Sequence, residues 1–221
     1  MTLNAIDLER TYDRRFAEAQ EYRLRVWEVL IRDFFQRFVP DDGNVMDLGC
    51  GFGEFINQIR ARDRFAMDLN TAARARLGEQ VTFLPQDCST RWLLDDESLD
   101  VVFTSNFFEH LPDKSALQAT VLEAFRTLKS GGRLICLGPN IKCVPGRYWD
   151  FWDHFIPLTE LSLRELLELS GFRTERCLTR FLPYSMATGF RPPVWTVSMY
   201  LKLPALWRLF GKQFLVVAVK P

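Results

Sequence analysis

The densest group of residues suited to chemistry lies in a glycine-rich turn. Glycines occupy three alternate positions between two carboxylates in the segment Asp47-Leu48-Gly49-Cys50-Gly51-Phe52-Gly53-Glu54. A turn without side chains lets a ligand approach the backbone closely. A dinucleotide fingerprint would place its third glycine at position 54, where this chain has Glu54. Two carboxylates disfavour a pyrophosphate and favour a ligand with cationic groups. The alternative is a glycine-rich turn that binds no ligand.

Further acids follow the next two predicted strands. Asp68 ends a strand predicted over 64–70 and can accept both hydroxyls of a ribose. Asp87 and Cys88 end a strand predicted over 81–87 and can lie beside an adenine edge. Each aspartate alone is equally well explained as a helix cap. Together with the turn, they outline a site for a nucleoside that carries ammonium and sulfonium groups, as S-adenosylmethionine does.

On these residues the chain resembles the class I S-adenosylmethionine-dependent methyltransferases, in the version that acts on small molecules. The resemblance covers about residues 42–140. In that family the strand-one Asp and the glycine loop hold the methionine part, the strand-two acid holds the ribose, and the strand-three Asp region holds adenine. The resemblance therefore implies S-adenosylmethionine as cofactor and a cofactor site built from Asp47, Gly49, Cys50, Gly51, Gly53, Asp68, Leu69, Asp87, Cys88, Asn106 and Phe107.

The segment after the fourth predicted strand bears on the acceptor. It reads Ser105-Asn106-Phe107-Phe108-Glu109-His110-Leu111-Pro112 and falls where the family lines the pocket near the sulfonium. Methyltransferases that modify amino groups of DNA bases usually carry a polar residue, two prolines and an aromatic there, which this segment does not match. Since no other nucleic-acid motif accompanies it, we expect no nucleic-acid partner.

The chain has two histidines, and both follow strands on the predicted binding edge. A hydroxyl is a weak nucleophile at neutral pH, and histidine is the natural residue to take its proton. We therefore name His110 and His154 as candidate catalytic bases. The alternatives are a capping or adenine-side structural role for His110 and a packed loop histidine, paired with Asp153, for His154.

Aromatic residues around His154 could wall the acceptor and exclude water during an in-line methyl transfer. Tyr148, Trp149 and Trp152 are the candidate acceptor-binding residues, and Phe107 and Phe151 could contribute. An aromatic face also attracts a cation such as a sulfonium. Ordinary core packing explains at least half of these rings equally well.

The spacing of apolar runs predicts the elements that position these residues. The predicted fold is α/β, a Rossmann-like, seven-stranded, mostly parallel sheet with helices on both faces and an antiparallel C-terminal edge strand. Strands are predicted over 44–49, 64–70, 81–87, 99–106, 133–139, 173–181 and 213–220. Helices are predicted over 7–38, 54–61, 71–78, 114–130 and 161–170.

The length of 221 residues predicts a single domain spanning 1–221. Residues 1–40 would form an N-terminal helical cap, in which Tyr12 and Phe16 could serve as a lid or simply pack. Residues 183–212 form a basic, aromatic insertion between the last two strands, where Pro204 would break or start a helix.

The net charge is zero, but residues 176–221 carry seven basic residues and no acid. A helix on an anionic lipid surface is typically rich in Trp, Leu and Lys or Arg and poor in acids. Residues 183–212 could therefore contact a membrane peripherally. The alternatives are that this insertion covers the substrate or forms a dimer contact. The N-terminus lacks a signal layout, and the five cysteines show no paired spacing, so we expect a cytoplasmic protein without a metal site.

These observations predict methyl transfer to a small or lipid-linked acceptor, with a hydroxyl of a sugar or glycan precursor as the first expectation. A quinone-type or other aromatic acceptor is the alternative enzymatic reading. A protein that binds the cofactor without catalysis, and acts as an adaptor through its basic insertion, is the alternative from another class. The sequence leaves the oligomeric state open.

Overall fold

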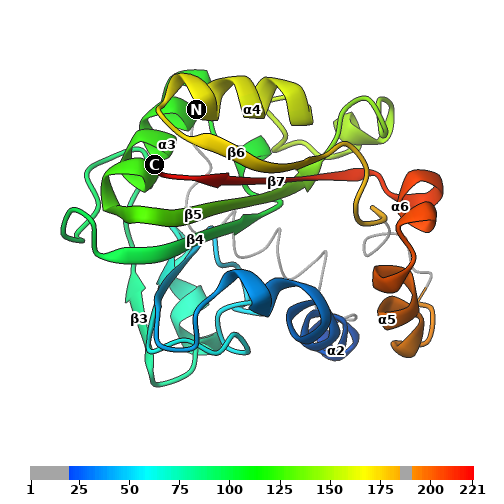
Figure 1. Cartoon of the computed structure of the whole chain (residues 1–221), viewed down its shortest axis with the longest axis horizontal. Helices are drawn as coiled ribbons and strands as arrows, with labels where there is room; N and C mark the ends of the chain where they lie inside the picture. Colours follow the sequence, from blue (N-terminus) through cyan, green and yellow to red (C-terminus); the bar gives the residue numbers. More distant parts are fainter. Residues whose placement is uncertain (1–19, 185–190) are drawn as a thin grey trace.

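The computed structural model describes residues 20–184 and 191–221, and a seven-stranded sheet forms its centre (Figure 1). The strand order is β3-β2-β1-β4-β5-β7-β6. The strands are β1 (Asn44–Leu48), β2 (Asp63–Met67), β3 (Val81–Leu84), β4 (Leu99–Ser105), β5 (Leu128–Pro139), β6 (Arg173–Leu178) and β7 (Gln213–Val219). β1 to β5 pair in parallel, whereas β7 is antiparallel to both β5 and β6. The predicted Rossmann-like sheet is confirmed, with β7 lying between β5 and the outermost strand β6.

The topology brings the predicted site residues to one edge of the sheet. The chain runs from β1 outward to β3 and then returns to β4 on the other side of β1, so the switch in strand order lies between β1 and β4. Ligands of open α/β sheets bind beyond the carboxyl ends of the strands at such a switch. Because β7 is antiparallel, its first residue, Gln213, pairs with Pro139 at this same edge.

Helices cover both faces of the sheet (Figure 1). One face carries α3 (Lys114–Thr127) and α4 (Glu160–Leu169), and the other carries α2 (Gln20–Leu30), α5 (Trp195–Lys202) and α6 (Pro204–Phe210). Each face has its own buried apolar cluster. Within the described residues, no helix is both long and apolar enough to cross a membrane.

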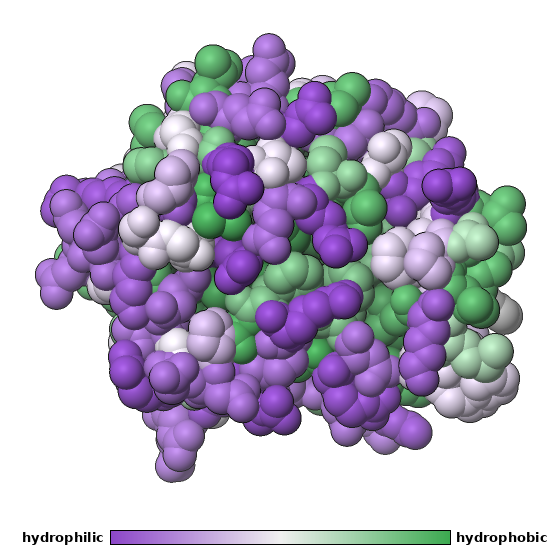
Figure 2. All heavy atoms as spheres, viewed as in Figure 1, coloured by the Kyte–Doolittle hydropathy of each residue, from purple (hydrophilic) through white to green (hydrophobic). Residues whose placement is uncertain are grey.

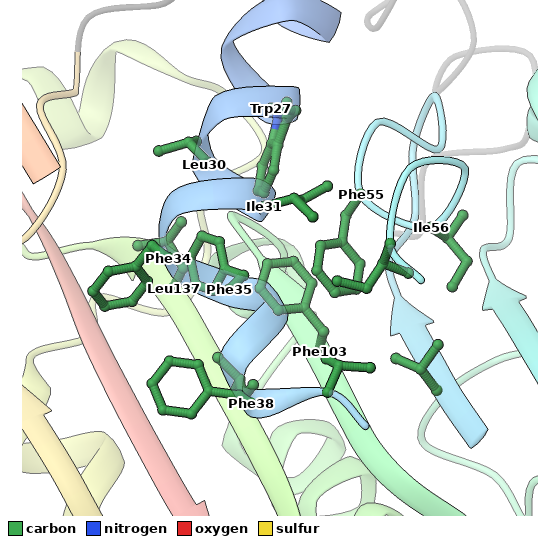
Figure 3. Close-up of a cluster of buried hydrophobic side chains, with 14 of the residues drawn as sticks. Trp27, Leu30, Ile31, Phe34, Phe35, Phe38, Phe55, Ile56, Phe103 and Leu137 are labelled. Carbon is green, nitrogen blue, oxygen red and sulfur yellow. The ribbon is translucent and has the colours of Figure 1, made fainter. Parts of the chain in front are cut away.

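An aromatic core fixes α2 over β4 and the segment after β1 (Figure 3). α2 continues into a π-helical turn, η2 (Ile31–Phe35), and a 3-10 turn, η3 (Gln36–Phe38). Phe35 from η2 meets Phe103 of β4 at a centroid distance of 5.2 Å, and Phe55 stacks on Phe103 at 3.8 Å. This packing ties the N-terminal helix to the residues that directly follow the glycine turn.

Two predicted helices differ in the structure. The prediction of a helix over 54–61 is wrong, because these residues form irregular turns. Side-chain amides compete with the backbone there: Asn57 donates to the carbonyl oxygen of Arg76, and Gln58 donates to that of Glu54. The helix predicted over 71–78 is instead a short 3-10 helix, η4 (Thr71–Arg76), with Asn70 as its N-cap.

The insertion predicted over 183–212 contains α5 and α6, and the break falls at Leu203, directly before Pro204. Large apolar side chains of α5 and α6 stay exposed, and apolar atoms gather over α6 in Figure 2. The structure describes the predicted N-terminal cap from residue 20 onward, so Tyr12 and Phe16 lie outside the described residues.

Candidate cofactor and acceptor site

The glycine turn after β1 has the backbone that only glycine adopts readily. Gly49, Gly51 and Gly53 have φ angles of +71°, +51° and +75°. A Cβ atom on Gly49 would lie 2.2 Å from the ring of Phe107, and one on Gly53 would lie 2.7 Å from the Leu77 side chain. The missing side chains at Gly49 and Gly53 thus let Phe107 and Leu77 pack directly against the backbone of the turn.

The substitution Gly49→Ala tests this turn. We expect affinity for S-adenosylhomocysteine, measured by calorimetry, to fall by at least about tenfold, because the new methyl group forces Phe107 or the turn to move. Gly131→Ala is the matched control: Gly131 has a φ of +80°, but its added Cβ would meet nothing within 4 Å. Equal cofactor affinity in both variants would contradict this account of the turn.

The two carboxylates that flank the turn differ in their surroundings. Asp47 is buried, and burial together with the charges of Glu54 and Asp68 raises its pKa well above the ordinary value. Glu54 is also buried, but its Oε1 lies 2.8 Å from Nε of Arg23 in α2. Arg23 therefore offsets the charge of Glu54, and this pairing was not expected from the sequence. Asp47 remains the acid of this pair that suits a cationic ligand.

Asp68 directly follows β2, and its carboxylate contacts the glycine turn. Its Oδ2 accepts a hydrogen bond from the backbone N–H of Gly51 at 3.0 Å, and its Oδ1 accepts one from Asn70 at 2.9 Å. Burial raises its pKa, whereas these hydrogen bonds and the positive charge of His110 lower it. The neighbouring Leu69 is 54% exposed, so an apolar surface lies open beside the carboxylate. Asp68 can accept hydrogen bonds from a ribose, and Leu69 can pack against the flat face of a base.

Asp87 and Cys88 follow β3 and have different roles in the structure. Asp87 is exposed and accepts hydrogen bonds from the backbone and hydroxyl of Ser89. Cys88 is buried, where burial raises the pKa of its thiol to about 12. Its carbonyl oxygen accepts a hydrogen bond from the indole of Trp92 at 2.8 Å. Asp87 thus presents its carboxylate at the surface, while the Cys88 side chain packs in the core.

Asn106 stands at the end of β4 with a positive φ of 51°. Its backbone N–H donates to Leu137 and its side-chain amide donates to Ser105. Its Oδ1 is buried and has no hydrogen-bond partner among the described residues. A buried acceptor without a partner costs about 1–3 kcal/mol, so a donor on a ligand at this edge would relieve it. With Asp47 and the bare turn, Asn106 gives a site that fits the ammonium group of S-adenosylmethionine.

The structure brings the two histidines together. His110 ends the 3-10 helix η5 (Phe108–His110), and its ring centroid lies 4.9 Å from that of His154. The backbone N–H groups of Phe155 and Ile156 donate to the carbonyl oxygen of Glu109, which fixes the loop of His154 against η5. His154 is buried and stacks on Phe151.

Asp153 orients His110. Nδ1 of His110 lies 2.9 Å from the carbonyl oxygen of Asp153 and 3.2 Å from its carboxylate oxygen Oδ2. Both atoms are acceptors, so Nδ1 carries the hydrogen and Nε2 is the basic nitrogen. Burial lowers the pKa of His110, but Asp153 and Glu109 raise it by more, so the net shift is upward. This arrangement suits an oriented general base.

The three predicted acceptor-binding residues lie in or beside the 3-10 helix η6 (Arg147–Asp150) and do not converge on one point. Tyr148 is fully buried, and its hydroxyl donates to the carbonyl oxygen of Ile156. Trp149 packs edge-on against Tyr148 but is 57% exposed, and Trp152 is 86% exposed. The ring of Tyr148 lies 4.6 Å from that of His154, so it supports the histidine from inside. Their role toward an acceptor stays a prediction.

One cluster among the described residues has donor atoms of the kind that bind metals. Atoms of Glu109, His110 and His154 lie within 4.8 Å of one another. Burial raises the pKa of Glu109 to about 7, which weakens it as a ligand near neutral pH. We interpret the cluster as an acid–base group and not as a metal site. We therefore expect that a chelator leaves the rate of methyl transfer unchanged.

Two contacts of the candidate site could not be predicted from the sequence. The partner of His110 is Asp153, forty-three positions away, and the partner of Glu54 is Arg23, thirty-one positions away. A single sequence carries no signal for either pair. Asp153 was considered only beside its neighbour His154.

Comparisons with known proteins agree with this geometry. Residues 46–136 match the methyltransferase domain family. The chain is 27% identical over 154 residues to the 2-methyl-6-phytyl-1,4-hydroquinone methyltransferase of Synechocystis, which covers 60% of this chain and 47% of that protein. The chain thus spans about half the length of this relative.

Two solved structures share the fold. A methyltransferase of Haloferax volcanii, solved with the activator Trm112, superposes with a TM-score of 0.70 at 21% identity over the full length of both chains. A SAM-dependent methyltransferase of Archaeoglobus fulgidus gives a TM-score of 0.67 at 20% identity, covering 93% of this chain and 99% of that one. Residues 46–136 therefore match the methyltransferase domain family, and the chain shares the fold of these two solved methyltransferases.

Proposed function

We propose that this methyltransferase modifies a hydroxyl of a small or lipid-linked acceptor, with His110 as the general base. The observation that carries the proposal is the contact of Nδ1 of His110 with Asp153, which leaves Nε2 as the basic nitrogen. The influence of His110 on the pKa of Asp68 supports a position beside the cofactor acids. A base held next to the methyl donor is what a weak hydroxyl nucleophile requires.

S-adenosylmethionine supplies, when bound, a methyl group on a positively charged sulfur. In our proposal Asp47 and Asn106 would hold its ammonium group, Asp68 would accept hydrogen bonds from the ribose hydroxyls, and Asp87 with Cys88 and Leu69 would border the adenine. Nε2 of His110 would take the proton of the acceptor hydroxyl as its oxygen bonds to the methyl carbon, and the carbon–sulfur bond would break with its electron pair left on the sulfur. Asp153 stabilises the imidazolium that results, while His154 and Phe151 limit water around it.

The acceptor itself is open to a direct test. Incubation with methyl-labelled cofactor and panels of glycan precursors, polyprenyl-linked sugars and hydroquinones would identify it. Label on the oxygen of a glycan or lipid-linked acceptor supports the proposal, and label on a hydroquinone supports the aromatic alternative, which the Synechocystis relative favours. Cofactor binding without transfer to any panel or to a cell lysate would support the non-catalytic adaptor and contradict the proposal.

The pH dependence of kcat tests the role of His110. A base must be neutral to act, so the rate should fall as pH decreases through the pKa of His110, which Asp153 and Glu109 raise above its ordinary value. Glu109, Asp153, His154 and Asp68 are the ionisable groups around it. The variant Asp153→Asn removes a charge that raises this pKa, so we expect its acid limb to move to lower pH.

Asp150→Asn is the control for that profile, because Asp150 is exposed on the neighbouring turn. We expect it to keep the wild-type pH profile. An acid limb that stays in place when Asp153 is replaced would show that another group, such as Glu109, governs the rate.

The basic insertion over 183–212 could place the enzyme at an anionic membrane. Lys202 and Arg208 are exposed on α5 and α6, next to the exposed apolar residues Leu203, Leu209 and Phe210. A mixed apolar and basic surface binds anionic lipid in a salt-dependent way. Co-sedimentation with anionic vesicles should therefore occur at low salt and weaken at high salt, and absence from the low-salt pellet would contradict this contact.

A further inference from the structure

A cavity of about 450 Å³ lies between α2 and the pair α5–α6. Its wall is almost entirely apolar and includes Val26 and Leu30 from α2, Val197 and Tyr200 from α5, and Leu206 from α6. This volume falls within the range of sites for small molecules, and such sites combine apolar walls with a few placed polar groups. The cavity is separate from the glycine turn that fits the cofactor.

One polar side chain in this wall has an acceptor atom without a hydrogen-bond partner among the described residues. Gln213, the first residue of β7, lines the cavity and is 5% exposed. Its Nε2 donates to the carbonyl oxygen of Pro183 at 2.8 Å, which fixes the orientation of the amide. Its Oε1 is buried and has no hydrogen-bond partner among the described residues. A ligand that fills the cavity and donates one hydrogen bond would satisfy this atom.

Contacts between residues lead from the cavity wall to the predicted acid–base group. Gln213 pairs with Pro139 at the edge where the parallel strands end. Pro183 lines the cavity, and the next residue, Tyr184, contacts the ring of Phe151 at a centroid distance of 6.1 Å. Phe151 in turn stacks on His154 at 4.9 Å. The cavity wall is thus linked, through Pro183, Tyr184 and Phe151, to the loop that holds Asp153 and His154.

One basic residue, Arg191, directly precedes Pro192 in the wall of the cavity. Burial raises the pKa of Tyr22, and the positive charge of Arg191 lowers it. Tyr22 lines the cavity and donates to the carbonyl oxygen of Pro192. Residues 191–221 contain five basic residues and no acid, which disfavours a cationic amphiphile.

We propose that this cavity binds the aliphatic chain of the acceptor and that Gln213 accepts a hydrogen bond from a hydroxyl on that chain. The acceptor is then a long-chain or prenyl compound with two hydroxyl groups, because the hydroxyl that donates to Gln213 is not the one that is methylated. The assignment as acceptor rests on the proposed methyl transfer, whereas binding of the chain does not.

Binding of 1-hexanol, 1-octanol and 1-decanol to the full chain, measured by calorimetry without turnover, tests the inference. Affinity should rise about fourfold for each added methylene group, as expected for burial in an apolar site. The variant Gln213→Leu should lose the preference for 1-decanol over its methyl ether, which has no hydroxyl hydrogen to donate. Affinity independent of chain length would overturn the proposal.

A matched pair of tryptophan variants in α6 locates the binding. Leu206 lines the cavity, whereas Leu209 does not line it and is 71% exposed. Leu206→Trp should reduce 1-decanol affinity at least about tenfold, while Leu209→Trp should stay within about twofold of the wild type. A thermal melt establishes that both variants fold. Equal effects of the two substitutions would overturn the proposal.

Other occupants of the cavity give distinct results. Vesicle binding without any binding of alkanols would assign the surface to a membrane and overturn the proposal. A dimer that Leu206→Trp dissociates, again without alkanol binding, would assign the cavity to a second copy and overturn it too. Alkanol binding in a protein that transfers no methyl group keeps this inference and contradicts the proposed function. Methyl transfer to a water-soluble acceptor without alkanol binding would support the proposed function and overturn this inference.

Discussion

Replacing His110 with alanine is expected to lower kcat by about 10²–10⁴-fold, the usual contribution of a general base. The loss should appear in kcat because His110 acts on the acceptor proton, and its Nδ1 is already held by Asp153. Cofactor affinity should stay within about threefold, since we assign the cofactor contacts to other residues. Single-turnover kinetics with saturating labelled cofactor would measure the chemical step.

His154→Phe is the companion variant. Phenylalanine keeps a ring between Tyr148, Phe151 and His110, so we expect a loss of less than about tenfold if His154 acts by packing. A larger loss in this variant than in His110→Ala would assign the base to His154. Losses below tenfold for alanine at both positions would remove general-base catalysis from the mechanism.

The second large effect is expected at Asp68. The substitution Asp68→Asn should weaken binding of S-adenosylhomocysteine by about 10–100-fold, because hydrogen bonds to a charged partner contribute about 1.5–3 kcal/mol. The amide keeps the shape of the carboxylate but has one acceptor oxygen instead of two. It can therefore serve the backbone of Gly51 or of Asn70, but not both together with a ribose.

Asp63→Asn is the control for Asp68, because it lies at the opposite end of the same strand and pairs with Arg62 in an exposed position. Calorimetry should give the wild-type affinity for this variant. If Asp68→Asn also bound the cofactor product as tightly as the wild type, the assignment of Asp68 to the ribose would be wrong.

The sequence predicted those parts of the site that depend on neighbouring positions. Three glycines within five residues and an acid after a strand are local patterns, and the sheet topology then brings Asp47 and Asp68 to one edge. The strands were predicted for the same reason, since apolar runs of four to eight residues report a buried sheet directly.

Other parts of the structure could not be predicted because they depend on long-range contacts. The helix predicted over 54–61 failed because Asn57 and Gln58 found partners elsewhere, among them the carbonyl oxygen of Arg76. The orientation of His110 depends on a loop beyond β5, and the cavity needs α2 and α6, which lie far apart in the chain. The apolar periodicity of the sequence predicted the helices themselves, but it did not indicate that a cavity lies between them.

Helix α2 touches both binding regions at once. Arg23 pairs with Glu54 beside the glycine turn, while Tyr22 and Val26, on the same helix, face the apolar cavity. A displacement of this helix would therefore change both the surroundings of the glycine turn and the shape of the apolar cavity. Thermodynamic linkage then requires symmetry: by whatever factor the nucleoside alters the dissociation constant for a lipid chain, the lipid chain alters that for the nucleoside. Titrations of each compound in the presence of the other would measure one shared coupling free energy.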